Sequence, residues 1–254
     1  MPSWDPAQYL RFSKQRTQPC IDLLNRIEID RVDNAVDLGC GPGNSTEQLA
    51  KRFPNAAITG LDNSADMIQR ARKDYPKFQF DQADAATWKS ERPCDVILSN
   101  AVFQWVERHE ILLPHLMKQL RPGGVLAVQM PRNFQSPTHQ ILRQLASDPH
   151  WSSKLEPREP YWVQEPAFYY DVLQPVSSSL EIWETEYIHV MPDHEAIVEW
   201  YKGTGLRPYL EALNASEQET FLQQYLVRLK ESYPRQKDGQ VLFPFLRIFF
   251  VARR

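Results

Sequence analysis

The chain is short of cysteine and glycine, and it has neither a long apolar run nor a block of one charge sign. Its three cysteines, Cys20, Cys40 and Cys94, are an odd number without metal-ligand spacing. We therefore expect no metal site and interpret them as reduced thiols of a cytoplasmic protein. No segment approaches the roughly 20 apolar residues of a membrane-spanning helix, and the N-terminus lacks the basic and apolar regions of a secretory signal. A net charge of −3 without a basic run argues against nucleic acid as a partner. Nothing in the sequence indicates a membrane or an obligatory protein partner.

Apolar runs alternate with stretches of helical periodicity from about residue 19 to residue 131. The runs 34–38, 57–61, 78–80, 95–98 and 125–129 predict five strands, and the spacing over 20–27, 44–53, 64–71 and 110–120 predicts helices between them. Ser45 and Gln48 have the spacing of a capping box at the start of the second helix. Strands separated by helices imply parallel pairing. We therefore expect an α/β, Rossmann-like sheet with helices on both faces.

The C-terminal half has a different pattern. Residues 180–189 and 241–252 predict two further strands, and residues 193–202 and 216–233 predict helices between them. The expected fold is a seven-stranded, mostly parallel sheet with an antiparallel last strand and a helical insertion. Seven of the 20 prolines lie within 131–175, beside many aromatic residues. Because proline removes a backbone donor, we predict an ordered aromatic-rich insertion that is not regular core.

Three of only nine glycines, Gly39, Gly41 and Gly43, fall in one turn directly after the first predicted strand. Glycine allows a tight turn and lets a ligand lie directly on the backbone, and the following helix N-terminus favours an anionic group. The dinucleotide fingerprint G-x-G-x-x-G/A requires a small third residue. That position is Asn44 or Thr46, depending on the first glycine, and neither residue fits. A dinucleotide is therefore excluded as the ligand.

An acidic residue followed by G-x-G-x-G, as in the run from Asp37 to Gly43, resembles the S-adenosylmethionine-dependent methyltransferases. The resemblance continues at Asp62, Asp84 and Asn100, which end or follow the next three predicted strands, and at the turn 120–124. It implies that S-adenosylmethionine is the cofactor and S-adenosylhomocysteine its product. The ribose would lie at Asp62, the adenine at Asp84 and the methionine portion at Asn100. The implied cofactor-binding residues are Asp37, Gly39, Gly41, Asn44, Asp62, Asn63, Asp84, Ala85, Asn100 and Arg16.

The segments 4–6, 9–13, 128–131, 191–194, 204–208 and 250–254 resemble one branch of that family along nearly the whole chain. This closer resemblance implies methyl transfer to a carboxylate of trans-aconitate, a small tricarboxylate, giving a monomethyl ester. We expect a single domain over 1–254. An N-terminal lid or helix would span 1–30, a cofactor-binding core 31–131, a substrate-side insertion with helices 132–240, and the final strand 241–254.

Methyl transfer to a carboxylate requires few catalytic groups from the protein. The acceptor is ionised at neutral pH, so no general base is needed and we assign no catalytic residue. A tricarboxylate does need fixed positive charge, for which arginine has the matching planar geometry. The N-terminal segment, with Trp4, Tyr9, Phe12 and Arg16, could close over the site or form a surface helix. The candidate substrate-binding residues are Arg132, Arg207, Arg247, His115, Trp105 and Tyr187.

For some of these residues a purely structural role is also possible, and other functions of the chain stay open at this point. Arg247 could face solvent from an edge strand, and Arg207 could be an exposed turn residue. Another small carboxylate, or a malonyl group on an acyl carrier, could be the acceptor, and the chain could be a cofactor-binding regulator without turnover. Nucleic-acid amino-methyltransferases of this fold carry prolines after the fourth strand, where this chain has Asn100-Ala101-Val102-Phe103. We therefore reject that last rival.

Overall fold

The computed structural model describes residues 13–157 and 162–254, without the side chains of Ser13, Lys14 and Arg16. The chain divides into two compact units. Of the described residues, the sheet unit comprises 16–131, 162–185 and 247–254, and the helical unit comprises 13–15, 132–157 and 186–246. Each unit is described by itself below.

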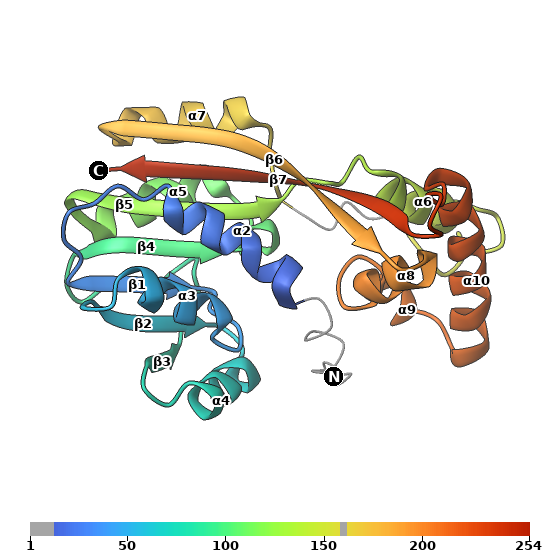
Figure 1. Cartoon of the computed structure of the whole chain (residues 1–254), viewed down its shortest axis with the longest axis horizontal. Helices are drawn as coiled ribbons and strands as arrows, with labels where there is room; N and C mark the ends of the chain where they lie inside the picture. The colour runs from blue at the N-terminus through green and yellow to red at the C-terminus, as the bar shows by residue number, and fades with distance from the viewer. Residues whose placement is uncertain (1–12, 158–161) are drawn as a thin grey trace. The chain divides into compact units, whose positions relative to one another are not determined.

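The expected seven-stranded sheet is confirmed, with strand order β3-β2-β1-β4-β5-β7-β6 (Figure 1). Neighbouring strands from β3 to β5 are parallel, and β7 is antiparallel to β5. The central strand β1 is buried along its whole length and β4 in all but its last residue, as the middle of a parallel sheet requires, whereas β3 at the edge has one buried residue. The strands are β1 (Asn34–Leu38), β2 (Ala57–Asp62), β3 (Gln79–Gln82), β4 (Cys94–Asn100), β5 (Leu120–Pro131), β6 (Ser179–Met191) and β7 (Val241–Arg253).

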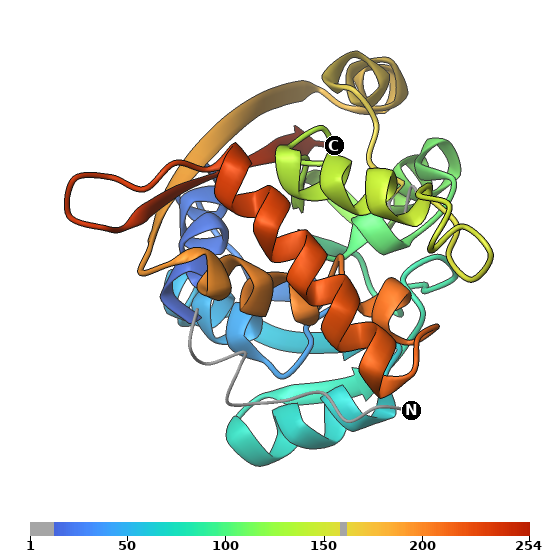
Figure 2. The same ribbon diagram turned by 90° about the vertical axis from the view of Figure 1, so that its right-hand side faces the viewer.

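Helices cover both faces of the sheet in the sheet unit. Figures 1 and 2 place α2 and α3 on one face and α5 on the other. Leu116 of α5 and Tyr169 of α7 pack in one core with Val128 of β5 and Phe250 of β7. The helices are α2 (Ser13–Asn25), α3 (Asn44–Arg52), α4 (Ala65–Asp74), α5 (His109–Gln119) and α7 (Pro166–Leu173), with short 3-10 turns η1 (Phe103–Trp105) and η2 (Gln174–Val176).

The helical unit has a separate core rich in aromatic side chains. In Figure 2, α10 runs past α6 and α8, and it contacts both of them. The buried side chains Trp151, Trp200, Tyr225 and Phe243 belong to this core. The helices of this unit are α6 (Pro137–Ala146), α8 (His194–Lys202), α9 (Arg207–Leu210) and α10 (Ala215–Ser232).

The prediction that the proline-rich stretch 131–175 is not regular core was wrong. It contributes two helices, and each begins with a proline in its first turn, Pro137 in α6 and Pro166 in α7. The first helical position needs no backbone donor and suits the fixed φ of proline. Trp151 and Tyr169 from the same stretch are 1% and 0% exposed and belong to the cores of the two units, whereas Trp162 and Tyr170 are about half exposed.

No helix in the described part of the chain combines the length and the apolar character that a bilayer span requires.

Asp95, at the start of β4, ties together three segments at the amino ends of the strands. Its Oδ2 accepts hydrogen bonds from the backbone N–H groups of Asp33 and Asn34, at 2.9 and 2.8 Å. Its Oδ1 accepts from Arg121 Nε. Burial alone would raise the pKa of Asp95, but the Arg121 guanidinium and the two N–H donors outweigh it and hold the pKa below its usual value.

Replacing Asp95 by asparagine is expected to lower the free energy of unfolding at neutral pH by about 2 kcal/mol, because one acceptor is lost and Arg121 loses its anion. A depressed folded-state pKa stabilises the protein above the unfolded value of roughly 4 and ceases to do so as the pH falls through the folded value. Urea unfolding of both proteins between pH 7 and pH 3 checks this. A difference that stays constant as the pH falls would contradict the assignment.

Candidate active site

The glycine turn between β1 and α3 is held against β2. The N–H groups of Gly39 and Cys40 both donate to the Leu61 carbonyl, at 2.7 and 2.8 Å. Gly39, Gly41 and Gly43 have φ values of +84, +52 and +98°, which side chains rarely adopt. A Cβ on Gly39 would lie 2.3 Å from Val102 Cγ2, whereas a Cβ on Gly41 would meet nothing within 4 Å. Gly39 therefore allows close packing, and Gly41 lies beside open space.

Asp37, near the end of β1, is fully buried. Its Oδ2 accepts hydrogen bonds from Ser45 Oγ at 2.7 Å and Thr46 Oγ1 at 2.6 Å. The capping-box prediction for Ser45 was wrong, because α3 has Gly43 as its N-cap and the Ser45 hydroxyl is committed to Asp37. Burial raises the pKa of Asp37 to about 6, against the opposing effect of the two hydroxyl donors.

Among the amide and carboxylate side chains of the described part of the sheet unit, four buried atoms have no hydrogen-bond partner. Three come from the carboxyl-end region of the adjacent strands β1, β4 and β5, and one comes from η1, which follows β4. A buried polar atom without a partner costs about 1–3 kcal/mol, so a concentration of them is typical of a ligand site. Three are acceptors and one is a donor. Within the described residues, these atoms are Asp37 Oδ1, Asn100 Oδ1, Gln104 Oε1 and Gln129 Nε2.

These four polar atoms fit the methionine portion of S-adenosylmethionine. Its α-ammonium has three N–H donors, and the three orphaned oxygens are acceptors. Two of them, on Asp37 and Asn100, belong to neighbouring parallel strands with Asp37 in register with Leu98. Together with the open space at Gly41, these groups would hold the amino-acid end of the cofactor.

Asp62, the last residue of β2, is oriented by two backbone donors. Gly41 N–H donates to its Oδ2 and Ser64 N–H to its Oδ1, each at 2.9 Å. A carboxylate oxygen can accept two hydrogen bonds, so each oxygen keeps acceptor capacity for a second donor. The half-buried carboxylate thus presents two acceptors side by side, which suits the two hydroxyls of a ribose.

The turn after β3 is fixed from within and from α5. Asp84 is exposed, and its Oδ1 accepts from Ala86 N–H at 2.9 Å, while Ala85 is buried. His115 donates from Nε2 to the Trp88 carbonyl at 2.7 Å. His115 therefore anchors the turn of Asp84, and the structure does not bring it together with Asp37, Asp62 and Asn100.

Two further predicted cofactor-binding residues, Asn44 and Asn63, differ in their exposure. Asn44 is the half-buried first residue of α3. Asn63 is exposed, and its carbonyl accepts from Gln82 Nε2 at 2.9 Å. Their predicted contacts with the cofactor stay predictions.

The structure places Arg247 in the interior. It is 4% exposed and lies in β7, which is paired with β5 on one side and followed by β6 on the other, so it is not on an edge strand. Its Nη1 donates to Gln129 Oε1 at 3.4 Å. The sequence interpretation had missed Gln129 and Gln104. Gln129 did leave a signal, since it is a polar residue inside the apolar run 125–130. Gln104 left none.

The other substrate candidates belong to different units, Trp105 to the sheet unit and Arg207 and Tyr187 to the helical unit. Trp105, in η1, is half exposed. Arg207 is exposed on α9 and paired with Glu211, with 2.7 Å between Nε and Oε1. Tyr187 is half-buried, with its ring 6.3 Å from that of His189. The side chain of Arg16 and the residues Trp4, Tyr9 and Phe12 lie outside the described residues, so the lid stays a prediction.

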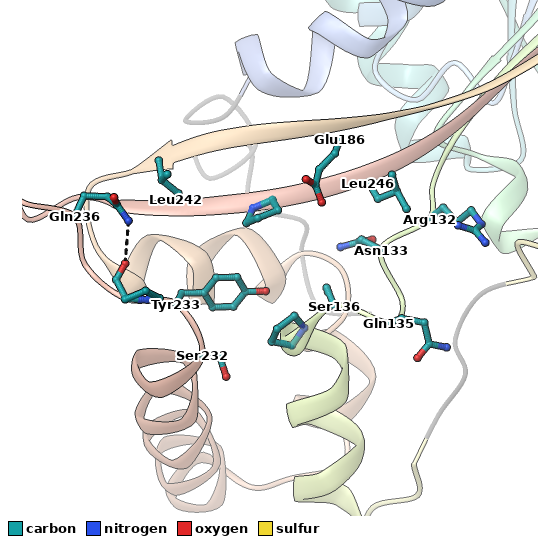
Figure 3. Close-up of a pocket in the computed structure, with 13 residues that line it drawn as sticks. Arg132, Asn133, Gln135, Ser136, Glu186, Ser232, Tyr233, Gln236, Leu242 and Leu246 are labelled. Atoms are coloured by element: carbon teal, nitrogen blue, oxygen red, sulfur yellow. Dashed lines mark hydrogen bonds between the residues drawn. The ribbon is translucent and has the colours of Figure 1, made fainter.

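Arg132 borders a pocket of about 560 Å³ inside the helical unit (Figure 3). Among the described residues that line it, the charged ones are Arg132 and Glu186, and Leu242, Pro244 and Leu246 form an apolar wall. One cation beside one anion offers no net positive charge. This lining is a poor match for a trianionic substrate.

Comparison with known proteins shows to which family the chain is related. A family described as a methyltransferase domain matches residues 35–124. The chain is 47% identical to a trans-aconitate 2-methyltransferase of Azoarcus sp. strain BH72, with all of both chains covered. It is 46% identical to the enzyme of that name from Escherichia coli O157:H7 strain EC4115, covering all of this chain and 99% of that one.

Two solved structures are similar in fold. The YcgJ protein from Bacillus subtilis has a TM-score of 0.62 and 12% identity over 93% of this chain and 98% of its own. A Haemonchus contortus phosphoethanolamine N-methyltransferase 2 in complex with S-adenosyl-L-methionine has a TM-score of 0.56 and 15% identity over 92% of this chain and 52% of its own.

The sheet order, the glycine turn and the matched domain define an S-adenosylmethionine-dependent methyltransferase. Within that class, full-length identity of 46–47% shows that the chain belongs to the trans-aconitate 2-methyltransferase family.

Asp37 is expected to make cofactor affinity depend on pH. Burial and the nearby charge of Asp62 keep its pKa near 6, so below that pH the carboxyl is protonated and is a weaker acceptor for an ammonium. Affinity for S-adenosylhomocysteine should fall by up to ~10-fold per pH unit below about pH 6, and binding there should release a proton. Titration calorimetry in buffers of different ionisation enthalpy measures both effects. Asp37→Asn should lose the slope; an unchanged slope in that variant would refute the assignment.

Proposed function

We propose that this protein transfers a methyl group from S-adenosylmethionine to a carboxylate of trans-aconitate, giving a monomethyl ester. The observation that carries the proposal is the 46–47% identity to enzymes named for this reaction, which extends over the whole chain and therefore over both units. The buried Arg247 beside the orphaned polar cluster supports it, because an anionic acceptor needs fixed positive charge near the donor.

Bound S-adenosylmethionine supplies a methyl group that its sulfonium already activates for displacement. The residues of this chain then bind and orient. Asp62 would accept from the ribose hydroxyls, and Asp37 and Asn100 from the ammonium, with the open space at Gly41 beside them. The acceptor carboxylate, with a reference pKa of about 4, is ionised at neutral pH. No residue needs to remove a proton, so alignment and exclusion of water are the protein's contribution.

The test is turnover with isotopically labelled S-adenosylmethionine. Trans-aconitate should yield a labelled methyl ester, identified by mass spectrometry, and cis-aconitate, isocitrate and citrate should be poorer acceptors. Malonyl groups on an acyl carrier serve as the rival acceptor. If none of the tricarboxylates is esterified, the proposed substrate is wrong, and if no acceptor gives turnover the regulator hypothesis replaces it.

We also propose a cytoplasmic location, supported by the free and buried state of Cys20, Cys40 and Cys94, which suits a reducing compartment. Fractionation of cells that express a tagged full-length chain tests it.

A further inference from the structure

A buried pair of side chains, Gln129 of β5 and Arg247 of β7, lies near the carboxyl end of β5. Their exposed fractions are 1% and 4%, and Arg247 Nη1 donates to Gln129 Oε1 at 3.4 Å. The antiparallel register places Arg247 opposite Pro131 and Gln129 opposite Phe249. The pair therefore bridges two neighbouring strands, and the guanidinium is held by the amide oxygen.

Gln129 is also tied to the end of β4. It is in register with Asn100, and the Ala101 N–H donates to the Gln129 carbonyl at 2.9 Å. Ala101 has φ +59°, an unfavourable conformation for a residue with a side chain, and such strain gathers at functional sites. This contact places Gln129 directly beside the residue assigned to the methionine portion of the cofactor.

The chemistry of the pair is that of a carboxylate binder. Gln129 uses its oxygen to orient Arg247, and its Nε2, buried and without a partner, is left as an additional N–H donor. Because an amide carries no charge, Gln129 orients the guanidinium without neutralising it. A guanidinium and an adjacent amide N–H can donate to a carboxylate, and charge-assisted bonds of this kind are strong.

The position of the Gln129–Arg247 pair in the sheet indicates that the bound carboxylate belongs to the methyl acceptor and not to the cofactor. The glycine turn follows β1, Asp62 ends β2, and the order of strands is β2-β1-β4-β5-β7. With about 4.8 Å between strands, β5 lies roughly 10 Å from β1, on the side away from the nucleotide residues. Asn100, at the end of β4, lies between these two strands, and its orphaned oxygen and that of Asp37, on β1 itself, match the ammonium.

We propose that Gln129 and Arg247 form the subsite that holds a carboxylate of the acceptor, with Gln129 determining specificity for an anion. This rests on the proposed function. Arg247 supplies the charge, and Gln129 both orients it and donates from Nε2.

The experiment compares Gln129→Glu, Gln129→Met and the wild-type full-length chain. Gln129→Glu keeps the shape but places an anion beside Arg247 and removes the N–H donor, and Gln129→Met removes both polar atoms. KM for trans-aconitate should rise ~100-fold or more in Gln129→Glu and ~10-fold or more in Gln129→Met. The Kd for S-adenosylhomocysteine should stay within ~3-fold. Gln174→Glu, an exposed site in the same unit, adds the same charge and should leave every value unchanged.

Two further readouts separate binding from folding. Calorimetry of trans-aconitate binding to the complex with S-adenosylhomocysteine should show the same loss as KM, without turnover. The monoamides of aconitate test charge selectivity, since the preference of the wild type for acid over at least one amide should be lost in Gln129→Glu. Thermal unfolding confirms that each variant is folded, and Arg247→Lys gives a second test if a Gln129 variant is not.

The outcomes are distinct. If the wild type esterifies trans-aconitate and both Gln129 variants keep its KM, the subsite is refuted while the proposed function stands. If the variants lose affinity for S-adenosylhomocysteine instead, the pair holds the cofactor and the proposal is overturned. If the wild type neither binds nor esterifies any tricarboxylate, the proposed function itself has failed.

Discussion

Replacing Gly39 by alanine is expected to destabilise the protein by about 3 kcal/mol and to lower cofactor affinity ~100-fold or more. The new Cβ would lie 2.3–2.8 Å from Val102 Cγ2, Cγ1 and Cβ, and the backbone has φ +84°. Valine is stiff at χ1 and cannot turn aside, so the turn or the segment after Asn100 must move. Urea unfolding and calorimetry with S-adenosylhomocysteine measure the two effects.

Gly239 is the matched control for Gly39. It has nearly the same backbone, φ +85°, with nothing within 4 Å of an added Cβ, and it lies in the other unit. Gly239→Ala should cost about 1 kcal/mol of stability and leave cofactor affinity unchanged. Gly39→Ala combined with Val102→Ala should recover part of the loss. Equal effects of the Gly39 and Gly239 variants on affinity would show that the glycine turn does not carry the cofactor.

Replacing Asp62 by alanine is expected to weaken cofactor binding by about 2–4 kcal/mol, which is roughly 30- to 1000-fold. The variant removes the acceptor of the Gly41 and Ser64 N–H groups as well as the two oxygens that we expect to accept from the ribose hydroxyls. The glycine turn therefore loses a support at the same time as the ligand loses its partner. Asp62→Asn keeps the shape and one oxygen, and it should lie between the wild type and Asp62→Ala.

Asp74, at the end of α4, provides the control for Asp62. It is exposed and pairs with Arg70 at 3.2 Å, so Asp74→Ala should change neither affinity nor stability by more than about 0.5 kcal/mol. Because Asp62→Ala also removes a support of the glycine turn, an analogue of S-adenosylhomocysteine without ribose hydroxyls should bind this variant more weakly than the wild type, but with a smaller loss than S-adenosylhomocysteine itself shows. If Asp62→Ala discriminates against that analogue as strongly as the wild type does, Asp62 is not the ribose residue.

Local patterns predicted most of the parallel half of the fold. β1 has the predicted bounds, and β2 and α3 differ from prediction by one residue. The long strands were underestimated, since β5 spans Leu120–Pro131 where the apolar run suggested 125–129. Its residues Arg121-Pro122-Gly123-Gly124, predicted as a turn, form an irregularity in the strand, because the register with β4 jumps from Leu120 to Val125 and Gly123 has φ +77°. The role of Ser45 was mistaken for a cap because the competing acceptor, Asp37, approaches it only in the folded chain.

The tertiary structure also distinguishes the three candidate arginines from one another. The sequence shows only that Arg132, Arg207 and Arg247 are all arginines. In the structure, Arg207 pairs with Glu211 on the surface of α9, whereas Arg247 is buried beside Gln129. Whether a charged side chain is buried depends on the residues that fold around it, and its position in the sequence does not show this. The same holds for Gln104, whose orphaned oxygen has no counterpart in any motif.

The sequence by itself determined the cofactor end of this protein. Glycines at positive φ and carboxylates at strand ends are requirements of single backbone positions, so the run from Asp37 to Gly43 and Asp62 could be recognised without coordinates. The subsite that we propose for the methyl acceptor depends on the tertiary structure alone. Gln129 and Arg247 are 118 positions apart, and they meet because the last strand pairs antiparallel with β5 in one particular register.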